Sequence, residues 1–568
     1  MAPITSWALA ALLLPFSALA SPTTDFDPLT TRHDNGKGND KGNNGNGKGN
    51  GGNKSKAPTV TINCGKLVGT TTTLPSATAS VNQYFGVPFA APPVRFEKPK
   101  PAQPWKGTRN ATKRAAACIQ QFGGSSTASA FTRQVFNDPP PIESEDCLFL
   151  NIFQPGGDNA PKGGYPVLFW LFGGGLQYGN SGQPAYDGSW FAGFEDVIVV
   201  TTNYRTNVFG FPASPELAVT DRNLGFYDQR MALQWVQKNI KSFGGDPKKV
   251  TIFGESAGAL SVDALVTTNY ENPPFRAAIM QSGQASLARF QARGNTTADW
   301  LELASLLGCG DAASPIACIR TKDPVLIKET AENNTLTFQP VADNVTLSSN
   351  AQAARAAKKI ANVPIMIGTN AQEGRVFAIG QNNLTAYLTT TFQNPALIAA
   401  INASYPRGRN GLLTDYDIIS AIYTDVVFTC PGALTANASA EAGYDTWRYF
   451  YTASFPNLNA VERIGIDLQA FHSSEIPIVF STYQNSTSTQ RGEPTAQQEA
   501  LSKYMRGAWA DFARDPKNGP GWNKLGTYNG TDLGVLGWQG SSGVTLANKT
   551  IADSKCKVFT PLYNLLGA

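Results

Sequence analysis

The sequence is poor in histidine, and this scarcity limits where acid–base chemistry can take place. Only two histidines occur among its 568 residues. His33 lies in a segment built mostly from Gly, Asn, Lys and Asp, which leaves His472 as the only imidazole in the part of the chain that reads as a folded domain. A reaction in that part that needs a histidine base must therefore use His472.

Charged residues are also few. They make up 15% of the chain, and the formal net charge is +4. Several of the positive charges belong to one N-terminal tract, so the rest of the chain has an ordinary surface without a strongly basic stretch. We expect no nucleic-acid partner.

Long apolar runs are scarce outside the N-terminus. Residues 1–20 contain an apolar run from Ala8 to Leu14 and end in Ala18-Leu19-Ala20, which resembles a cleavage site. The run has no preceding Lys or Arg, and it is too short to span a membrane. It predicts a signal peptide over 1–20. No second run of membrane-spanning length and no lipid-anchor signal occur later in the chain, so we expect no stable membrane anchor.

Sequons for N-glycosylation recur along the chain, as expected of a secreted, extracellular glycoprotein. They begin at Asn110, Asn295, Asn333, Asn344, Asn383, Asn402, Asn437, Asn485, Asn529 and Asn548.

Residues 21–57 have almost no apolar surface to bury, which predicts a disordered linker or a removable propeptide. A calcium-binding loop is the alternative, but acidic residues are sparse there and no closing Glu stands at the required spacing. We expect no metal and no cofactor. No break in composition and no repeat divides residues 58–568, so this part of the chain is predicted to be one large domain.

Near-continuous apolar runs indicate strands that are covered on both faces, as in a mostly parallel sheet flanked by helices. A helical pattern runs from 225 to about 243 and ends at two glycines. The fold class is therefore α/β, and a helical excursion at 350–360 is a candidate cap. The expected strands are 60–62, 68–71, 84–90, 148–153, 167–172, 197–202, 250–253, 277–280, 363–368 and 448–451.

The strand at 250–253 leads into Gly254-Glu255-Ser256-Ala257-Gly258 and then into an Ala/Leu-rich segment. Strand, Gly-x-Ser-x-Gly and helix together predict a nucleophile elbow, a turn so sharp that the glycines are needed to avoid collisions. Ser256 is then a candidate nucleophile. A chance match in a Gly-rich chain is the alternative.

A serine hydroxyl needs a base, and His472 is the only histidine that a catalytic Ser256 could use. A carboxylate must orient the imidazole, and in the chain order Ser, acid, His it falls between 256 and 472. Glu373 comes after the strand predicted at 363–368. Asp343 and Asp425 lie in the same interval without that context.

Gly173-Gly174-Gly175 comes directly after the apolar run that ends at Phe172. Their N–H groups can approach a carbonyl oxygen without side-chain obstruction, and Ala257 supplies another N–H at the start of a helix. These groups are candidates for an oxyanion hole, although a flexible turn is the alternative reading.

Seven cysteines in a secreted chain suggest three pairs and one left over. Cys309 and Cys318 are close enough in sequence for local pairing, and Cys64 has no obvious partner. Sequence alone leaves the connectivity open.

Two long segments resemble signatures of the type-B carboxylesterase/lipase family, which includes fungal lipases and cholinesterases. They are 145–155, Glu-Asp-Cys-Leu-Phe-Leu-Asn-Ile-Phe-Gln-Pro, and 243–258, which ends in the predicted elbow. The resemblance extends from about 58 to the C-terminus. It implies an α/β-hydrolase fold, a triad of Ser256, Glu373 and His472, and an oxyanion hole of Gly174, Gly175 and Ala257. It also implies the disulfides Cys118–Cys147, Cys309–Cys318 and Cys430–Cys556.

These features predict a secreted serine esterase that acts on a small-molecule ester or lipid through an acyl-enzyme. A lipase that opens a lid at an oil surface is one alternative, but the loop 119–146 shows no clear amphipathic helix. A non-catalytic binding protein is another, and an intact triad argues against it. The loop from Cys118 to Cys147 contains no Trp, and Phe136 is the nearest counterpart of the aromatic residue with which cholinesterases hold choline. We therefore do not expect a choline-specific site.

Overall fold

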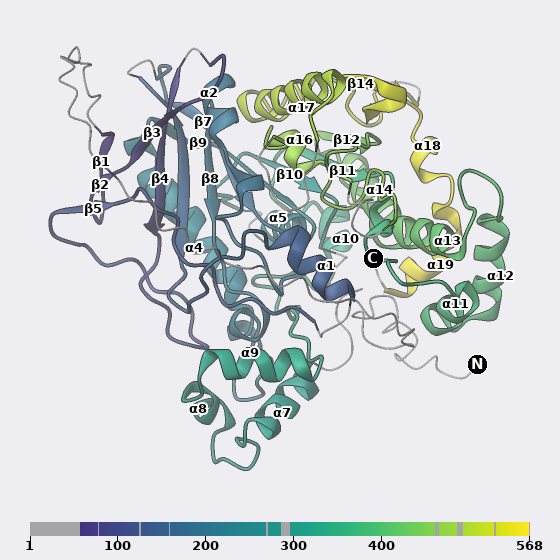
Figure 1. Ribbon diagram of the computed structural model, residues 1–568, viewed down its shortest axis with the longest axis horizontal. Coiled ribbons are helices and arrows are strands. Elements are labelled where there is room, and N and C mark those ends of the chain that lie inside the picture. Colours follow the sequence, from purple (N-terminus) through teal and green to yellow (C-terminus); the bar gives the residue numbers. More distant parts are fainter. Residues whose placement is uncertain are drawn as a thin grey trace, which may run out of the picture.

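The computed structural model describes residues 57–77, 79–123, 127–157, 160–268, 271–285, 296–459, 465–484, 492–527 and 530–566. The predictions for 1–20 and for almost all of 21–57 lie outside these residues. A sheet of 11 strands dominates the fold, in the order β14-β13-β12-β11-β10-β9-β7-β8-β6-β4-β3 (Figure 1). A separate three-stranded sheet has the order β1-β2-β5.

The strands from β8 through β7, β9, β10, β11 and β12 to β13 run parallel, and both margins of the sheet are antiparallel. This confirms the predicted α/β fold with a mostly parallel centre. The strands are β1 Thr59–Ile62, β2 Gly65–Val68, β3 Thr70–Thr73, β4 Ser80–Pro88, β5 Thr108–Asn110, β6 Phe149–Pro155, β7 Tyr165–Leu171, β8 Ile198–Thr202, β9 Gly245–Glu255, β10 Ala277–Gln281, β11 Ile365–Asn370, β12 Thr446–Tyr451, β13 Leu533–Leu536 and β14 Val544–Ala547.

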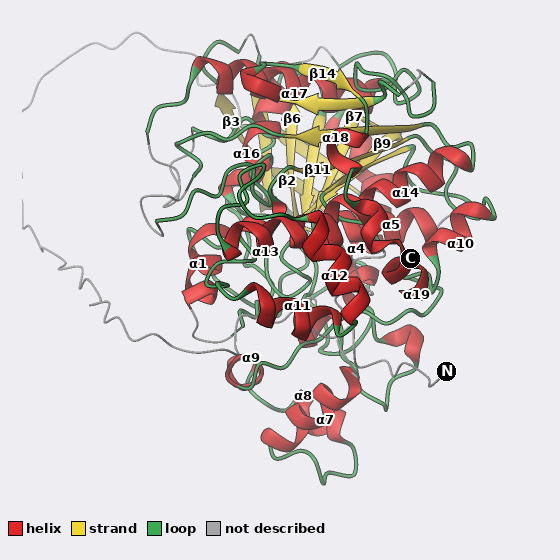
Figure 2. Cartoon of the chain, turned by 90° about the vertical axis from the view of Figure 1, so that its right-hand side faces the viewer, coloured by secondary structure: helices red, strands yellow, loops and turns green. Residues whose placement is uncertain are grey.

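Helices cover both faces of the sheet, and Figure 2 shows α11, α12 and α13 grouped at one end of the strands. The α-helices are α1 Thr127–Phe136, α2 Ser189–Phe194, α3 Asn207–Gly210, α4 Leu224–Asn239, α5 Ala257–Thr268, α7 Thr296–Leu306, α8 Pro315–Arg320, α9 Pro324–Asn333, α10 Ala351–Ala356, α11 Leu384–Phe392, α12 Pro395–Ser404, α13 Asp415–Tyr423, α14 Cys430–Glu441, α16 Ile476–Val479, α17 Ala496–Arg514, α18 Thr550–Asp553 and α19 Cys556–Leu566.

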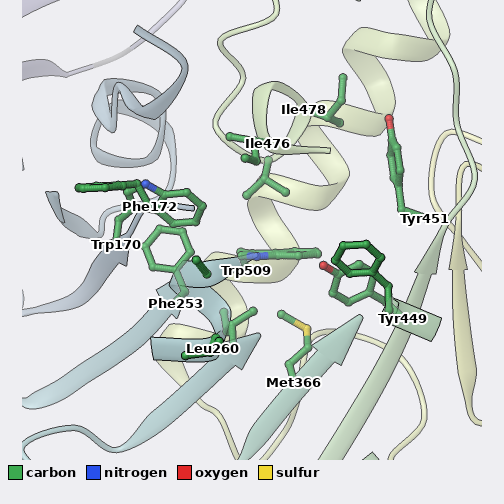
Figure 3. Packing of buried hydrophobic residues seen from close by; sticks show 14 of the residues in the cluster. Trp170, Phe172, Phe253, Leu260, Met366, Tyr449, Tyr451, Ile476, Ile478 and Trp509 are labelled. Carbon is green, nitrogen blue, oxygen red and sulfur yellow. The ribbon is translucent and has the colours of Figure 1, made fainter. Parts of the chain in front are cut away.

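The central strands are buried on both faces because each face has its own apolar core. In β7, Leu168 and Trp170 belong to one core, and Val167, Phe169 and Leu171 belong to the other. Figure 3 shows the first core, where Trp170, Phe253 and Trp509 lie close together above the sheet. Alternating side chains that all meet apolar partners explain why these strands read as continuous apolar runs.

Two local expectations were wrong. The strand expected at 68–71 is interrupted at Gly69, where a Cβ would lie 2.4 Å from the carbonyl oxygen of Gln83. The expected cap at 350–360 forms α10, but α10 packs against α5 and α14, with Arg355 buried in an ion pair with Asp263. It therefore belongs to the helical layer and does not cover the site.

The helical run Asp415–Glu441 is long and apolar enough to cross a membrane by length and composition alone. In the fold, 83% of its most apolar 18-residue stretch is buried, as in the core helix of a globular protein. Its apolar side chains therefore pack against the rest of the protein.

Three disulfides join Cys118 to Cys147, Cys309 to Cys318 and Cys430 to Cys556, the pairs that the family resemblance implies. Cys64 is free and buried.

Candidate active site

Ser256 stands between the last residue of β9 and the first residue of α5. Its φ is 57°, in the left-handed region that non-glycine residues rarely adopt. A Cβ on Gly254 would lie 2.6 Å from the carbonyl oxygen of Leu171, and one on Gly258 would lie 2.0 Å from the same atom. The glycines are required because the strand, the turn and the helix approach each other so closely. The predicted elbow is present.

The triple glycine lies directly against this turn. A Cβ on Gly173 would come within 3.0 Å of the Ser256 Cβ. Gly174 and Gly175 have φ of 104° and 62°, and within the described residues their N–H groups make no hydrogen bond. The two N–H groups are therefore free to donate to a bound oxygen.

Tyr204 holds Phe172, the residue directly before the triple glycine. Its ring stacks on Phe172 with centroids 4.2 Å apart, and its hydroxyl donates to the Phe172 carbonyl at 2.7 Å. The start of the triple glycine is thus held by a ring and a hydrogen bond.

His472 Nδ1 lies 2.6 Å from Glu373 Oε2, and both side chains are buried. The other carboxylate oxygen of Glu373 accepts the N–H of Asn370, the last residue of β11. A carboxylate held in this way can fix the orientation and the tautomer of the imidazole.

The alternative acids bond elsewhere. Asp343 accepts three N–H groups and the Thr346 hydroxyl in its own loop. Asp425 accepts the Tyr405 hydroxyl at 2.6 Å. Of the three candidates, Glu373 is the one that contacts the imidazole.

The other imidazole nitrogen faces a second carboxylate that the sequence analysis missed. His472 Nε2 lies 3.1 Å from Oε1 of Glu255, which also accepts the Ser473 hydroxyl at 2.6 Å. Within the described residues, no hydrogen bond joins Ser256 to His472. The imidazole therefore lies between two carboxylates, with the candidate nucleophile next to one of them in sequence.

A third buried carboxylate, Glu475, was also missed. It accepts hydrogen bonds from Gln281 at 3.0 Å and from Asn370 at 2.6 Å. Both acids stand within three residues of Ser256 or His472, which was the only signal in the sequence. The fold, and not their place in the sequence, brings Glu255 and Glu475 close to His472.

These three carboxylates favour the protonated form of His472. Burial lowers the pKa of His472, but Glu255, Glu373 and Glu475 outweigh it and raise that pKa to about 9. Burial also raises the pKa of the Glu255 carboxyl, against the lowering effect of His472. Protonated His472 and ionised Glu255 therefore stabilise each other.

Aromatic rings surround the imidazole. Phe428 and Phe377 have ring centroids 4.6 and 5.0 Å from that of His472, and Tyr423 stacks on Phe377 at 4.9 Å. The rings keep water from this side of His472.

An open pocket lies beside Ser473, the residue after His472. Its wall is mostly apolar and includes Phe136, Tyr186, Leu458, Phe471 and Ile476. The cavity can accommodate an apolar group close to the imidazole.

α1 lies within the Cys118–Cys147 loop, where we had expected no clear amphipathic helix; that expectation was wrong. Phe131 and Val135 of α1 pack with Val376, Ile379 and Leu468 from the loops that carry Glu373 and His472. Thr and Ser residues, which are weak helix formers, stand within this helix and hid it in the sequence.

Comparison with known proteins defines the class. A model of the carboxylesterase family matches residues 56–536. The chain is 33% identical to carboxylesterase 5A of Felis catus over 488 residues, 82% of this chain and 87% of the relative. It is 33% identical to para-nitrobenzyl esterase of Bacillus subtilis over 473 residues, 80% and 89% of the two chains. It is 30% identical to cholinesterase of Mus musculus over 546 residues, 89% and 84%.

The chain belongs to the carboxylesterase family. It is a serine hydrolase of carboxylic esters with the α/β-hydrolase fold, and its substrates are small-molecule esters.

Proposed function

We propose that hydrolysis proceeds through a triad of Ser256, His472 and Glu373 and a covalent acyl-enzyme. The observation that carries this proposal is the 2.6 Å contact between His472 Nδ1 and Glu373 beside the strained elbow of Ser256. The free N–H groups of Gly174 and Gly175, together with that of Ala257, form the oxyanion hole.

In the first half of the reaction, His472 Nε2 takes the hydroxyl proton of Ser256 while Oγ attacks the ester carbonyl. The imidazole must turn from Glu255 toward Ser256, an adjustment of the kind common when substrate binds. The oxyanion rests on the three N–H groups. His472 then returns the proton to the departing alcohol, and the acyl group stays on Ser256. Water repeats the sequence and releases the acid.

Hydrolysis of a short p-nitrophenyl ester tests this proposal. The native protein should release p-nitrophenolate with an initial burst, and Ser256→Ala should lose the burst and the turnover. Turnover by Ser256→Ala close to that of the native protein would refute the triad. The same assay excludes a purely binding role if the native protein is active.

A lipase is the second candidate, and α1 is the observation that favours it. The helix buries an apolar face over the loops of Glu373 and His472, so opening it would expose apolar surface to a lipid. The test measures rate against concentration across the solubility limit of a triglyceride. A jump in rate above the limit indicates interfacial activation, and a smooth saturation curve indicates a soluble esterase.

We also propose that residues 1–20 are a signal peptide, 21–57 a linker or propeptide, and that the domain 58–568 is secreted as a glycoprotein. Three disulfides support an oxidising destination. Among the residues that the structure describes, six sequon asparagines are exposed: Asn110, Asn333, Asn344, Asn383, Asn402 and Asn548. N-terminal sequencing of the secreted protein, and its mass before and after deglycosylation, test these points.

A further inference from the structure

The helical run from α13 to α14 contains a widened turn, η6, at Thr424–Thr429. The N–H of Cys430 donates to the carbonyl of Asp425, five residues earlier, which is the pattern of a π-helix. Such turns are rare and occur frequently at functional sites. This one lies beside the loop of Glu373 and beside His472.

Thr424 joins η6 to the acid loop. Its Oγ1 accepts the N–H of Gly374 at 2.8 Å and donates to the carbonyl of Ser420 at 2.8 Å. Thr424 is 4% exposed, so water cannot replace either bond easily. A Cβ on Gly374 would lie 2.1 Å from the Ser420 carbonyl oxygen. The peptide after Glu373 is therefore held tightly against this helix.

Phe428 joins the same turn to the base. Its buried ring lies 4.6 Å from the imidazole of His472, centroid to centroid. Phe377, three residues after Gly374, stacks on it at 5.7 Å. One turn of helix thus touches both the acid loop and the histidine.

We propose that η6 positions the two partners of Ser256, with Thr424 fixing the Glu373 loop and Phe428 fixing the ring of His472. Thr424 contacts the acid loop and Phe428 contacts the imidazole, so we assign both as positioning residues. This inference rests on the triad proposed above.

The same turn supplies a matched control. Thr429 is 1% exposed, and its hydroxyl has no hydrogen-bond partner among the described residues. Replacing Thr by Val changes the same atoms at either position, but only at Thr424 does it remove the acceptor of the Gly374 N–H. A general effect of altering the helix would appear in both variants.

The experiment compares the native protein with Thr424→Val, Thr424→Ser and Thr429→Val. Active sites are counted by organophosphate titration, so that kcat refers to folded enzyme. Thr424→Val should lower kcat roughly 10- to 100-fold, as expected for a displaced catalytic group, with little change in KM. Thr424→Ser, which keeps the hydroxyl, and Thr429→Val should stay near the native kcat.

The pH profile separates positioning from loss of stability. When Glu373 is held less firmly, it raises the pKa of His472 less, so the acid limb of kcat for Thr424→Val should move to lower pH. The other carboxylates around the imidazole, Glu255 from β9 and Glu475 before α16, are unchanged in every variant. A variant that is only less stable would keep the native limb.

If Thr424→Val matches Thr429→Val in kcat per titrated site and in its acid limb, the inference is overturned while the triad stands. If the native protein turns over ester but takes no label, the triad itself fails. Should Thr424→Val not fold, Phe428→Leu replaces it in the test. A native kcat and acid limb for Phe428→Leu would then overturn the proposal, and a lower kcat at constant KM would support it.

Discussion

Glu373 and Glu255 contact different nitrogens of the His472 imidazole, and the two contacts have different consequences. Glu373 meets Nδ1, the nitrogen that does not face the nucleophile in a serine triad. Glu255 meets Nε2, the nitrogen that takes the Ser256 proton in the proposed triad. Removal of either carboxylate therefore tests a different step.

Glu373→Gln should lower kcat by very roughly 10⁴-fold, because the amide no longer fixes the tautomer or stabilises the imidazolium. The measurement is kcat per titrated site on a p-nitrophenyl ester. Asp343→Asn is the control, since Asp343 bonds within its own loop. Near-native turnover by Glu373→Gln would remove it from the triad.

Glu255→Gln should move the acid limb of kcat/KM to lower pH. The base must be neutral, and the Glu255 carboxylate favours the protonated imidazole, whose pKa stands at about 9. Without that charge the pKa of His472 falls, and His472 is neutral in a larger fraction of the enzyme at pH 7. Glu475→Gln should shift the limb less, because Glu475 has a weaker influence on His472. An acid limb that stays in place or moves to higher pH would show that Glu255 does not raise the pKa of His472.

Among single residues, one motif and one count led to the prediction of Ser256 and His472. The structure shows Ser256 in the elbow and His472 in contact with Glu373, and their catalytic roles stay a proposal. Glu255 and Glu475 could not be assigned a role in advance. A carboxylate has no sequence signature for burial, and these two meet His472 only through the packing of β9, β11 and the loop before α16.

The element that the site depends on most is the turn from β9 to α5, and its glycines can be tested. Gly258→Ala would place a Cβ 2.0 Å from the Leu171 carbonyl oxygen. We expect it to lower the free energy of unfolding by about 1–3 kcal/mol or more, with loss of activity. Urea unfolding followed by tryptophan fluorescence measures the change.

Gly507 in α17 is the matched control. A Cβ there meets nothing within 4 Å, and its backbone is helical. Gly507→Ala should therefore leave activity unchanged and raise stability by up to about 1 kcal/mol. Equal effects of the two substitutions would mean that the elbow is not under steric constraint.

Elements were predictable where burial was uniform. β7, β8 and β10 are buried along their whole length, so their apolar runs identified them. α1 and η6 were missed for different reasons. α1 is rich in residues that favour strands. η6 contacts segments far from it in sequence, the acid loop through Thr424 and α19 through Tyr563, which donates to the Val426 carbonyl.

For the whole molecule, the disulfides differ in the length of chain they close. Cys430 and Cys556 are 126 residues apart, and Cys309 and Cys318 are 9 apart. Replacing the first pair by Ala should lower the free energy of unfolding by about 5 kcal/mol, and the second by about 3 kcal/mol, on the chain-entropy estimate. Urea unfolding of the two double variants checks the order. A larger loss for the short loop would contradict it.

The role of Ser256 as the nucleophile is tested by mapping the residue that an organophosphate modifies. The native protein is inactivated with an organophosphate, digested with trypsin and analysed by mass spectrometry. We expect one adduct on Ser256, within peptide 250–276, with inactivation in proportion to labelling, and none in Ser256→Ala. An active enzyme that is inactivated with no adduct on that peptide would contradict this role of Ser256.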